Sequence, residues 1–218
     1  MLPVFVFDAY GTLFDVHAAV RHHAEAVGPD ADRLSALWRT KQLEYSWTRA
    51  LSGEYVDFWR LTEAALDYAF EKIPGTNRET REELLDAYRT LDAYPEVIDV
   101  LTRLRDAGAK TAILSNGSPG MLELAVRAAK IGELLDDVIS VDSLRTYKPL
   151  PVVYEQVTTK FRVFPDAVSF QSSNRWDVAG ASAFGFRTVW INRTGEPEEY
   201  PDMAPAATLS DLNGLDTL

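Results

Sequence analysis

Residues 4–13 of this chain are Val4-Phe5-Val6-Phe7-Asp8-Ala9-Tyr10-Gly11-Thr12-Leu13. The first four are apolar, with β-branched and aromatic side chains, and this pattern predicts a short buried strand. Asp8 follows the strand directly, and Gly11 indicates a turn just beyond it. Ligands of an open α/β sheet bind beyond the carboxyl ends of its strands, so we expect Asp8 to face a binding site. A partly desolvated carboxylate needs a cation or hydrogen-bond donors, which we expect from elsewhere in the chain.

The composition is typical of a globular protein that stays in solution. The 218 residues are 46% hydrophobic and 25% charged, which suits one α/β domain or a core with a modest insertion. The chain has 33 acidic and 22 basic residues. This balance argues against a nucleic-acid partner, which needs a basic face. A small anionic substrate would need a local cationic site to overcome the general negative field.

Cysteine and long apolar segments are missing from the sequence. The absence of Cys excludes disulfides, thiolate metal sites and a Cys nucleophile, and it is compatible with the cytoplasm, where we expect the protein to work. No apolar run approaches the ~20 residues of a membrane span, so we expect no membrane partner. The chain begins directly with a strand, without the basic and apolar regions of a signal peptide.

Beyond residue 95 the pattern alternates between helix and strand. Helices are predicted at 96–107, 119–130, 151–161 and 176–184, and strands at 110–114, 138–141, 167–170 and 188–191. With the first strand, this makes five strands separated by helices, which predicts an α/β fold with a doubly wound, Rossmann-like parallel sheet. The tail from residue 196 onward is rich in Pro and acidic residues, and we expect it to run over the surface.

Residues 16–92 break this alternation. The segments near 17–27, 32–50, 55–71 and 78–90 all have helical patterns, and none is a convincing strand. A block of helices at this place predicts an inserted, all-helical cap subdomain at residues 16–92. Residues 1–15 and 93–218 would then form the α/β core domain.

Polar residues follow four of the predicted strands. They are Asp8 and Thr12, Ser115 and Asn116, Lys148, and Ser172, Ser173, Asn174 and Asp177. The carboxyl ends of parallel strands meet at one edge of a sheet, so these side chains are expected to converge. An Asp nucleophile with hydroxyl donors, a Lys and a second Asp is a coherent set for covalent catalysis.

Each of these residues also has an ordinary structural interpretation. Taken alone, Asp8 is about as often a turn or capping residue as a catalytic one. Lys148 before Pro149 is more often a solvated loop residue, and Asp177 could simply charge a helix N-terminus. It is their joint placement at successive strand ends that favours a catalytic interpretation.

Four segments resemble the sequence motifs of the haloacid dehalogenase superfamily, in the right order and over essentially the whole chain. They are Asp8-Ala9-Tyr10-Gly11-Thr12, Ser115-Asn116-Gly117, Tyr147-Lys148-Pro149 and Ser172-Ser173-Asn174-Arg175-Trp176-Asp177. The phosphatase branch has a second Asp two residues after the nucleophile, where this chain has Tyr10. The chain is therefore most similar to the L-2-haloacid dehalogenases, which residues 38–47 and 190–193 also resemble.

The resemblance implies hydrolysis of short-chain L-2-haloalkanoic acids to D-2-hydroxyalkanoic acids and halide, through an ester on Asp8. It implies a homodimer that uses no metal and no cofactor. The implied catalytic residues are Asp8, Lys148, Thr12, Asn174, Asp177 and Ser172. The implied substrate- and halide-binding residues are Tyr10, Arg39, Ser115, Asn116, Phe58, Tyr154 and Trp176.

Within these sets the resemblance implies particular roles. Asp8 is the nucleophile that Lys148 keeps ionised, and Arg39 and Asn116 cradle the halide. Ser115 binds the substrate carboxylate, while Phe58 and Trp176 form an apolar wall. Two positions depart from the family pattern, since Arg175 stands where a small residue is expected and Thr40 where Gln is expected. Either change could alter substrate preference.

Two other functions stay open. A Mg²⁺-dependent phosphatase of the same fold is one, but with Tyr10 in place of the second Asp its general acid would be missing. Displacement of a halide needs no such acid, because halide already leaves as an anion. A non-catalytic binding protein of this fold is the other, and the nearly complete polar set argues against it.

Overall fold

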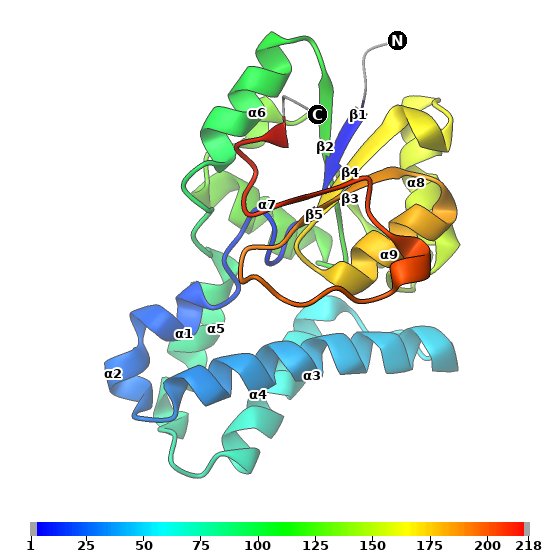
Figure 1. Ribbon diagram of the computed structural model, residues 1–218. Helices are drawn as coiled ribbons and strands as arrows, with labels where there is room; N and C mark the ends of the chain where they lie inside the picture. Colours follow the sequence, from blue (N-terminus) through cyan, green and yellow to red (C-terminus); the bar gives the residue numbers. More distant parts are fainter. Residues whose placement is uncertain (1–3, 216–218) are drawn as a thin grey trace.

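Figure 1 shows the computed structural model of the protein, which describes residues 4–215. Within this range six parallel strands form one sheet: β1 (Val4–Phe7), β2 (Lys110–Ser115), β3 (Asp137–Ser140), β4 (Val168–Ser172), β5 (Arg187–Ile191) and β6 (Ala207–Leu209). Their order is β3-β2-β1-β4-β5-β6. The chain switches direction across the sheet between β1 and β4, and doubly wound sheets bind ligands at such a point. The predicted α/β fold is confirmed.

Helices cover both faces of the sheet. Figure 1 shows α6 (Val97–Asp106) and α7 (Pro119–Ala128) on one face, with α8 (Pro151–Phe161) and α9 (Arg175–Phe184) on the other. Short 3₁₀ turns lie between these elements, at Gly132–Leu134, Val141–Leu144, Pro165–Ala167 and Pro201–Met203. Because both faces are covered, β1 is entirely apolar. β4 is buried along its whole length, although Ser169, Gln171 and Ser172 in it are polar.

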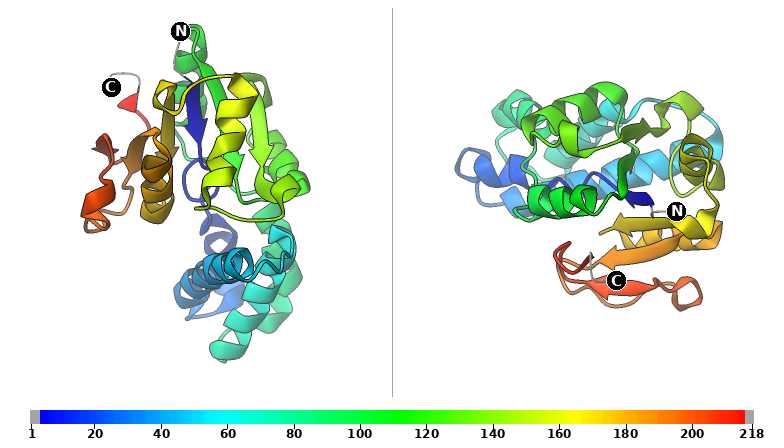
Figure 2. Two further views of the ribbon diagram at one scale, coloured as in Figure 1. Left: turned by 90° about the vertical axis from the view of Figure 1, so that its right-hand side faces the viewer. Right: turned by 90° about the horizontal axis from the view of Figure 1, so that it is seen from above.

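The chain between β1 and α6 is helical. It contains α1 (Ala18–His22), α2 (Ala24–Val27), α3 (Ala31–Ser52), α4 (Phe58–Lys72), a 3₁₀ turn at Arg78–Thr80 and α5 (Arg81–Arg89). Figures 1 and 2 show these helices beyond the carboxyl ends of the strands, with the long α3 crossing under that edge of the sheet. The side chain of Trp38 on α3 is buried against α4, where its indole N–H donates to the Thr62 carbonyl at 2.8 Å.

Local sequence accounts for where α3 and α4 end and begin. Gly53 follows α3 with a φ of 72°, a left-handed conformation that Gly adopts without steric cost and that commonly ends helices. Asp57 precedes α4, and its side chain accepts a hydrogen bond from the backbone N–H of Arg60. Residues 53–57 therefore form a short connection after which α4 packs against α3.

The C-terminal tail differs from the sequence prediction. Ala207–Leu209 pairs with β5, so the sheet within residues 4–215 has six strands instead of five, and the tail does not simply run over the surface. Leu212 and Leu215 beyond it are also buried. A three-residue, partly exposed edge strand has too little periodicity to stand out from a Pro-rich segment, which explains the wrong prediction. No helix between residues 4 and 215 is both long and apolar enough to cross a bilayer.

Gly180 on α9 allows a close contact that we expect to be essential for packing. A Cβ atom at Gly180 would lie 2.5 Å from Pro149 Cβ and 2.7 Å from the Tyr154 hydroxyl oxygen. Gly180→Ala should therefore destabilise the protein by about 1–3 kcal/mol, as overpacking does in other cores. Urea unfolding measures the change. Gly120→Ala on α7 is the matched control, because nothing lies within 4 Å of its Cβ. Equal stability of the two variants would contradict this packing.

Candidate active site

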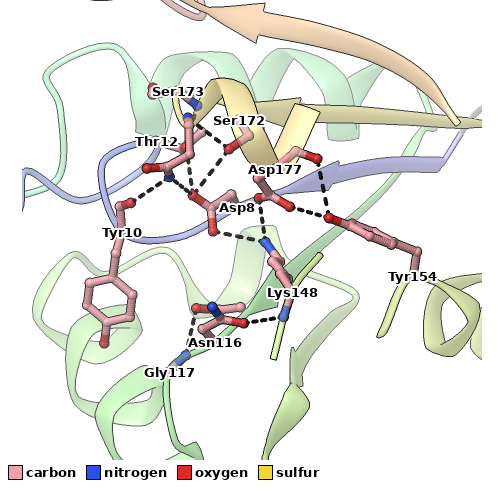
Figure 3. Close-up of polar contacts among 12 residues, drawn as sticks. Asp8, Tyr10, Thr12, Asn116, Gly117, Lys148, Tyr154, Ser172, Ser173 and Asp177 are labelled. Atoms are coloured by element: carbon pink, nitrogen blue, oxygen red, sulfur yellow. Dashed lines mark hydrogen bonds and ion pairs between the residues drawn. The ribbon is translucent and has the colours of Figure 1, made fainter. Parts of the chain in front are cut away.

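Three ionisable side chains meet in the interior at the carboxyl edge of the sheet (Figure 3). Lys148 Nζ donates to Asp8 Oδ1 at 3.0 Å and to Asp177 Oδ2 at 2.8 Å. Asp8 follows β1, Lys148 lies before α8, and Asp177 lies in the first turn of α9. The exposed fractions are 6% for Asp8, 1% for Lys148 and 0% for Asp177. The structure therefore pairs Asp8 with the cation that its partial desolvation requires.

Burial and mutual attraction set the protonation of this group. Burial raises the pKa of Asp177 to about 6, although the adjacent Lys148 opposes the shift. Burial alone would lower the pKa of Lys148, but the charges of Asp177 and Asp8 outweigh it and raise that pKa. Lys148 thus keeps its proton at neutral pH, and the pKa of Asp177 lies closer to neutrality than that of an exposed Asp.

The second oxygen of Asp8 has three donors. Thr12 Oγ1 lies 3.1 Å from Asp8 Oδ2, Ser172 Oγ lies 3.4 Å from it, and Asn174 Nδ2 lies 2.8 Å from it. The hydroxyl oxygen of Thr12 also accepts a hydrogen bond from the Ser173 backbone N–H at 2.8 Å. These contacts join the loop after β1 to the end of β4 and orient the Asp8 carboxylate.

The carbonyl oxygen of Tyr10 is surrounded by N–H donors. Asn174 Nδ2 lies 3.3 Å from it and Arg39 Nη2 lies 3.1 Å from it. Arg39 Nη2 is also 3.2 Å from Asn174 Oδ1. A Mg²⁺ ion between Asp8 and this carbonyl would need oxygen ligands around it. The NH₂ group of Asn174, a hydrogen-bond donor, lies at that place instead. The donor set at this position does not fit a divalent cation.

Asn116 and Ser115 lie at the end of β2, on the other side of Lys148. The Lys148 backbone N–H donates to Asn116 Oδ1 at 3.0 Å, which leaves the NH₂ end of this amide as a donor. Ser115 Oγ accepts from the Gly117 backbone N–H at 3.1 Å. The predicted pairing of Arg39 with Asn116 stays a prediction, since Arg39 Nη2 binds the Tyr10 carbonyl and Asn174 Oδ1 instead.

Aromatic rings form one side of the site. The Tyr10 ring stacks on Tyr88 of α5, with centroids 5.7 Å apart, and lies 6.3 Å from the ring of Phe58. The half-buried Trp176 meets Trp47 of α3 edge-on at 5.4 Å. Tyr154 is fully buried behind the ionic group, and its hydroxyl donates to Asp177 Oδ1 at 2.8 Å. All predicted site residues thus lie around the same edge of the sheet.

Some residues at this edge were not singled out from the sequence. Tyr88 approaches Tyr10 only through the fold, and no local pattern distinguishes it from an ordinary helix residue. Trp47 ends the segment 38–47 that resembles the family, but its contact with Trp176 was not predicted. The two departures from the family pattern also differ in kind. Thr40 is exposed and donates to the Ala36 carbonyl of its own helix, whereas Arg175 is buried.

The sequence profile of the haloacid dehalogenase-like hydrolases matches residues 2–185. The (S)-2-haloacid dehalogenase 1 of a Pseudomonas species, strain CBS-3, is 51% identical over 98% of this chain and 94% of that protein. The chain belongs to the L-2-haloacid dehalogenase family. The prediction of the family from the sequence is therefore confirmed.

Solved structures of dehalogenases match over the whole fold. The crystal structure of a dehalogenase with an intermediate complex is 46% identical, with a TM-score of 0.96 over 98% of this chain and 95% of that one. The L-2-haloacid dehalogenase of Xanthobacter autotrophicus with chloropropionic acid covalently bound is 36% identical. Its TM-score is 0.89, over 100% of this chain and 98% of that one. This family member thus shares both its sheet and the helices between β1 and α6 with these two structures.

The hydrogen bond from Tyr154 should set the acidity of Asp177. It stabilises the ionised carboxylate and so lowers the pKa of Asp177 against the effect of burial. We expect Tyr154→Phe to raise that pKa above its present value of about 6, so that more of the carboxyl group is protonated at neutral pH. Carbon NMR of Asp carboxyl groups during a pH titration measures this. Tyr68→Phe, at an exposed position of α4, is the control. An unchanged or lower pKa in Tyr154→Phe would disprove this role.

Proposed function

We propose that this protein hydrolyses short-chain L-2-haloalkanoic acids to D-2-hydroxyalkanoic acids and halide, through an ester on Asp8. The proposal rests on the position of the Asp8 carboxylate, which lies between the Lys148 ammonium and the Asn174 amide. A phosphatase of this fold would need a metal cation at the place of that amide. Two relatives add support. One is an (S)-2-haloacid dehalogenase, and another carries chloropropionic acid covalently bound.

In the first step an oxygen of Asp8 attacks the α-carbon of the acid from the side opposite the halogen. The new C–O bond forms as the C–halogen bond breaks, and the halide leaves with the bonding electrons. Attack from behind inverts the α-carbon, which converts an L-haloacid into a D-configured ester. Arg39 and the NH₂ group of Asn116 would stabilise the departing anion, since charged donors act most strongly where charge develops.

In the second step water attacks the carboxyl carbon of Asp8. The bond between that carbon and the ester oxygen breaks, so the configuration at the α-carbon is kept and the hydroxyacid leaves with an oxygen from Asp8. Asp177 is our candidate for the base that accepts the proton of the water, because its pKa of about 6 suits a general base near neutral pH. Asp177 then passes this proton to the departing alkoxide, so that the product leaves as the hydroxyacid. Asp8, which has gained one oxygen atom from water, releases the second proton of that water to solvent and is again a carboxylate.

The remaining site residues orient these groups. Thr12, Ser172 and Asn174 would hold one oxygen of Asp8, and Tyr154 would hold Asp177. Ser115 and neighbouring backbone N–H groups would bind the carboxylate of the substrate. The apolar wall of the site would consist of Tyr10, Phe58 and Trp176.

We also propose a division into an α/β core, at residues 1–15 and 93–218, and a helical cap at residues 16–92. The position of α1–α5 beyond the strand ends supports this division, as does the contact of Arg39 on α3 with the Tyr10 carbonyl.

The proposal further includes a homodimer, which rests on the family resemblance. It includes a cytoplasmic location, which is compatible with a chain that has no Cys.

An isotope experiment tests the ester on Asp8. In a single turnover in oxygen-18 water with excess enzyme, we expect the label in Asp8 and none in the hydroxyacid, because water attacks the carboxyl carbon of the ester. Mass spectrometry of the peptide that contains Asp8 measures it. Asp8→Asn should lose activity by several orders of magnitude, as enzymes do without their nucleophile. Label that appears directly in the hydroxyacid would show that water attacks the substrate instead.

Chelation separates dehalogenation from phosphatase chemistry. With N–H donors at the Tyr10 carbonyl, we expect halide release from L-2-chloropropionate to be unaffected by EDTA. We also expect negligible hydrolysis of phosphate esters with Mg²⁺, because the site has no residue equivalent to the phosphatase general acid. Halide release is measured by ion chromatography, with D-2-chloropropionate as the control for stereochemistry. Activity that is lost in EDTA and restored by Mg²⁺, together with phosphatase turnover, would favour the phosphatase instead.

A further inference from the structure

An apolar pocket of about 350 Å³ lies beside the catalytic group, on the side of α9. Its lining includes Trp47 and Leu51 of α3, Trp176 of α9, and Tyr200 from the segment after β5. Lys148 also lines this pocket, although its Nζ atom is 3.0 Å from the Asp8 carboxylate. Lys148 therefore lies between the Asp8 carboxylate and an apolar space for which the roles proposed above use Trp176 but not Trp47, Leu51 or Tyr200.

Helix α3 connects the same two places. Arg39 of α3 contacts Asn174, and eight residues further along Trp47 contacts Trp176, two residues after Asn174. At 1.5 Å per residue these two contacts are about 12 Å apart along the helix axis. Leu51 is one more turn along and has 85% of its surface exposed. The helix thus runs from Asn174, which binds the Asp8 carboxylate, past the two indoles, to the exposed Leu51 that lines the pocket.

A buried arginine binds the segment that carries Tyr200. Arg175, whose side chain is 4% exposed, binds Glu198 Oε1 through Nε at 2.7 Å. Its Nη2 donates to the backbone oxygens of Tyr200 and Met203, both at 3.0 Å. The guanidinium also lies 5.6 Å from the centre of the Tyr200 ring. Arg175 therefore fastens this segment to the start of α9, next to Trp176.

The backbone of Tyr200 shows why such an attachment is needed. Its φ of 51° lies in the left-handed region, which costs a residue with a Cβ atom free energy unless the surroundings compensate. The bonds from Arg175 to the carbonyls of Tyr200 and Met203 compensate this cost. The position of the Tyr200 ring thus depends on a residue that stands where the family pattern has a small one.

We propose that this pocket is the subsite for the alkyl chain of 2-haloacids longer than propionate, and that Arg175 is the positioning residue for its Tyr200 wall. The proposal rests on the proposed function. The lining is almost entirely apolar, so it suits methylene groups better than a second charge. Each methylene that moves from water into the pocket should raise kcat/KM about fourfold, until the pocket is filled.

Filling the pocket from its open end tests the subsite. The measured quantity is kcat/KM for L-2-chlorohexanoate divided by kcat/KM for L-2-chloropropionate. Leu51→Trp should lower this ratio about tenfold, because the indole would take the space of roughly two methylenes. Phe164→Trp is the matched control, since Phe164 is 82% exposed and lies before β4, at the opposite edge of the sheet. It should leave the ratio unchanged.

The role of Arg175 needs a readout that a merely structural residue would not change. Arg175→Ala should raise KM for L-2-chlorohexanoate several-fold more than KM for L-2-chloropropionate, because the wall that contacts only the longer chain is released. Arg175→Lys keeps the charge opposite Glu198 and should recover part of this difference. Equal changes for both acids, in kcat as well as KM, would show that Arg175 supports the fold alone.

The two proposals fail in different ways. If the wild-type protein releases halide from L-2-chloropropionate and Leu51→Trp does not change the ratio, the subsite is wrong and the proposed function stands. If the wild-type protein releases halide from neither acid, the proposed function is wrong, and the subsite with it.

Discussion

The buried contact of Lys148 with two carboxylates is the constraint on which the rest of the structure depends. Removing an ion from water costs several kcal/mol, and the ionic group repays this only with good geometry and further hydrogen bonds. Lys148 obtains that geometry from Asp8 and Asp177, and Tyr154 satisfies the second oxygen of Asp177. Because β1, the segment before α8 and the start of α9 each supply one charge, their relative positions are fixed to within hydrogen-bond distance.

The charge balance of this group explains the donors around it. Two carboxylates and one ammonium leave one excess negative charge when all are ionised, and the proposed substrate is itself an anion. The amide N–H of Asn174 binds Asp8, and Arg39 adds a positive charge close by; both also bind the Tyr10 carbonyl. A neutral residue at position 10 avoids a further carboxylate here. The N–H groups of Asn174 and Arg39 therefore suit a site that would bind a haloacid anion and later release a halide ion.

Sequence reasoning succeeded wherever local patterns carry the information. The apolar run before Asp8 and the segment at residues 151–161 have strong patterns of their own, and the structure places β1 and α8 there. It failed for β6, whose three residues form a strand only because β5 offers them a free edge. The contacts of Trp47 with Trp176 and of Arg175 with Glu198 join distant segments, and no spacing within either segment indicates them.

The helices over the sheet edge and the catalytic group share the residues that connect them. Besides Arg39 and Trp47, a third connection joins the loop between α3 and α4 to the segment just before Lys148. There the Tyr55 hydroxyl donates to Asp142, and the Tyr147 hydroxyl donates to the Val56 carbonyl. Tyr147 directly precedes Lys148, so a movement of that loop would reach the Lys148 backbone and, through Nζ, the Asp8 carboxylate. One short segment of chain therefore connects the helices over the sheet edge with the lysine that binds Asp8.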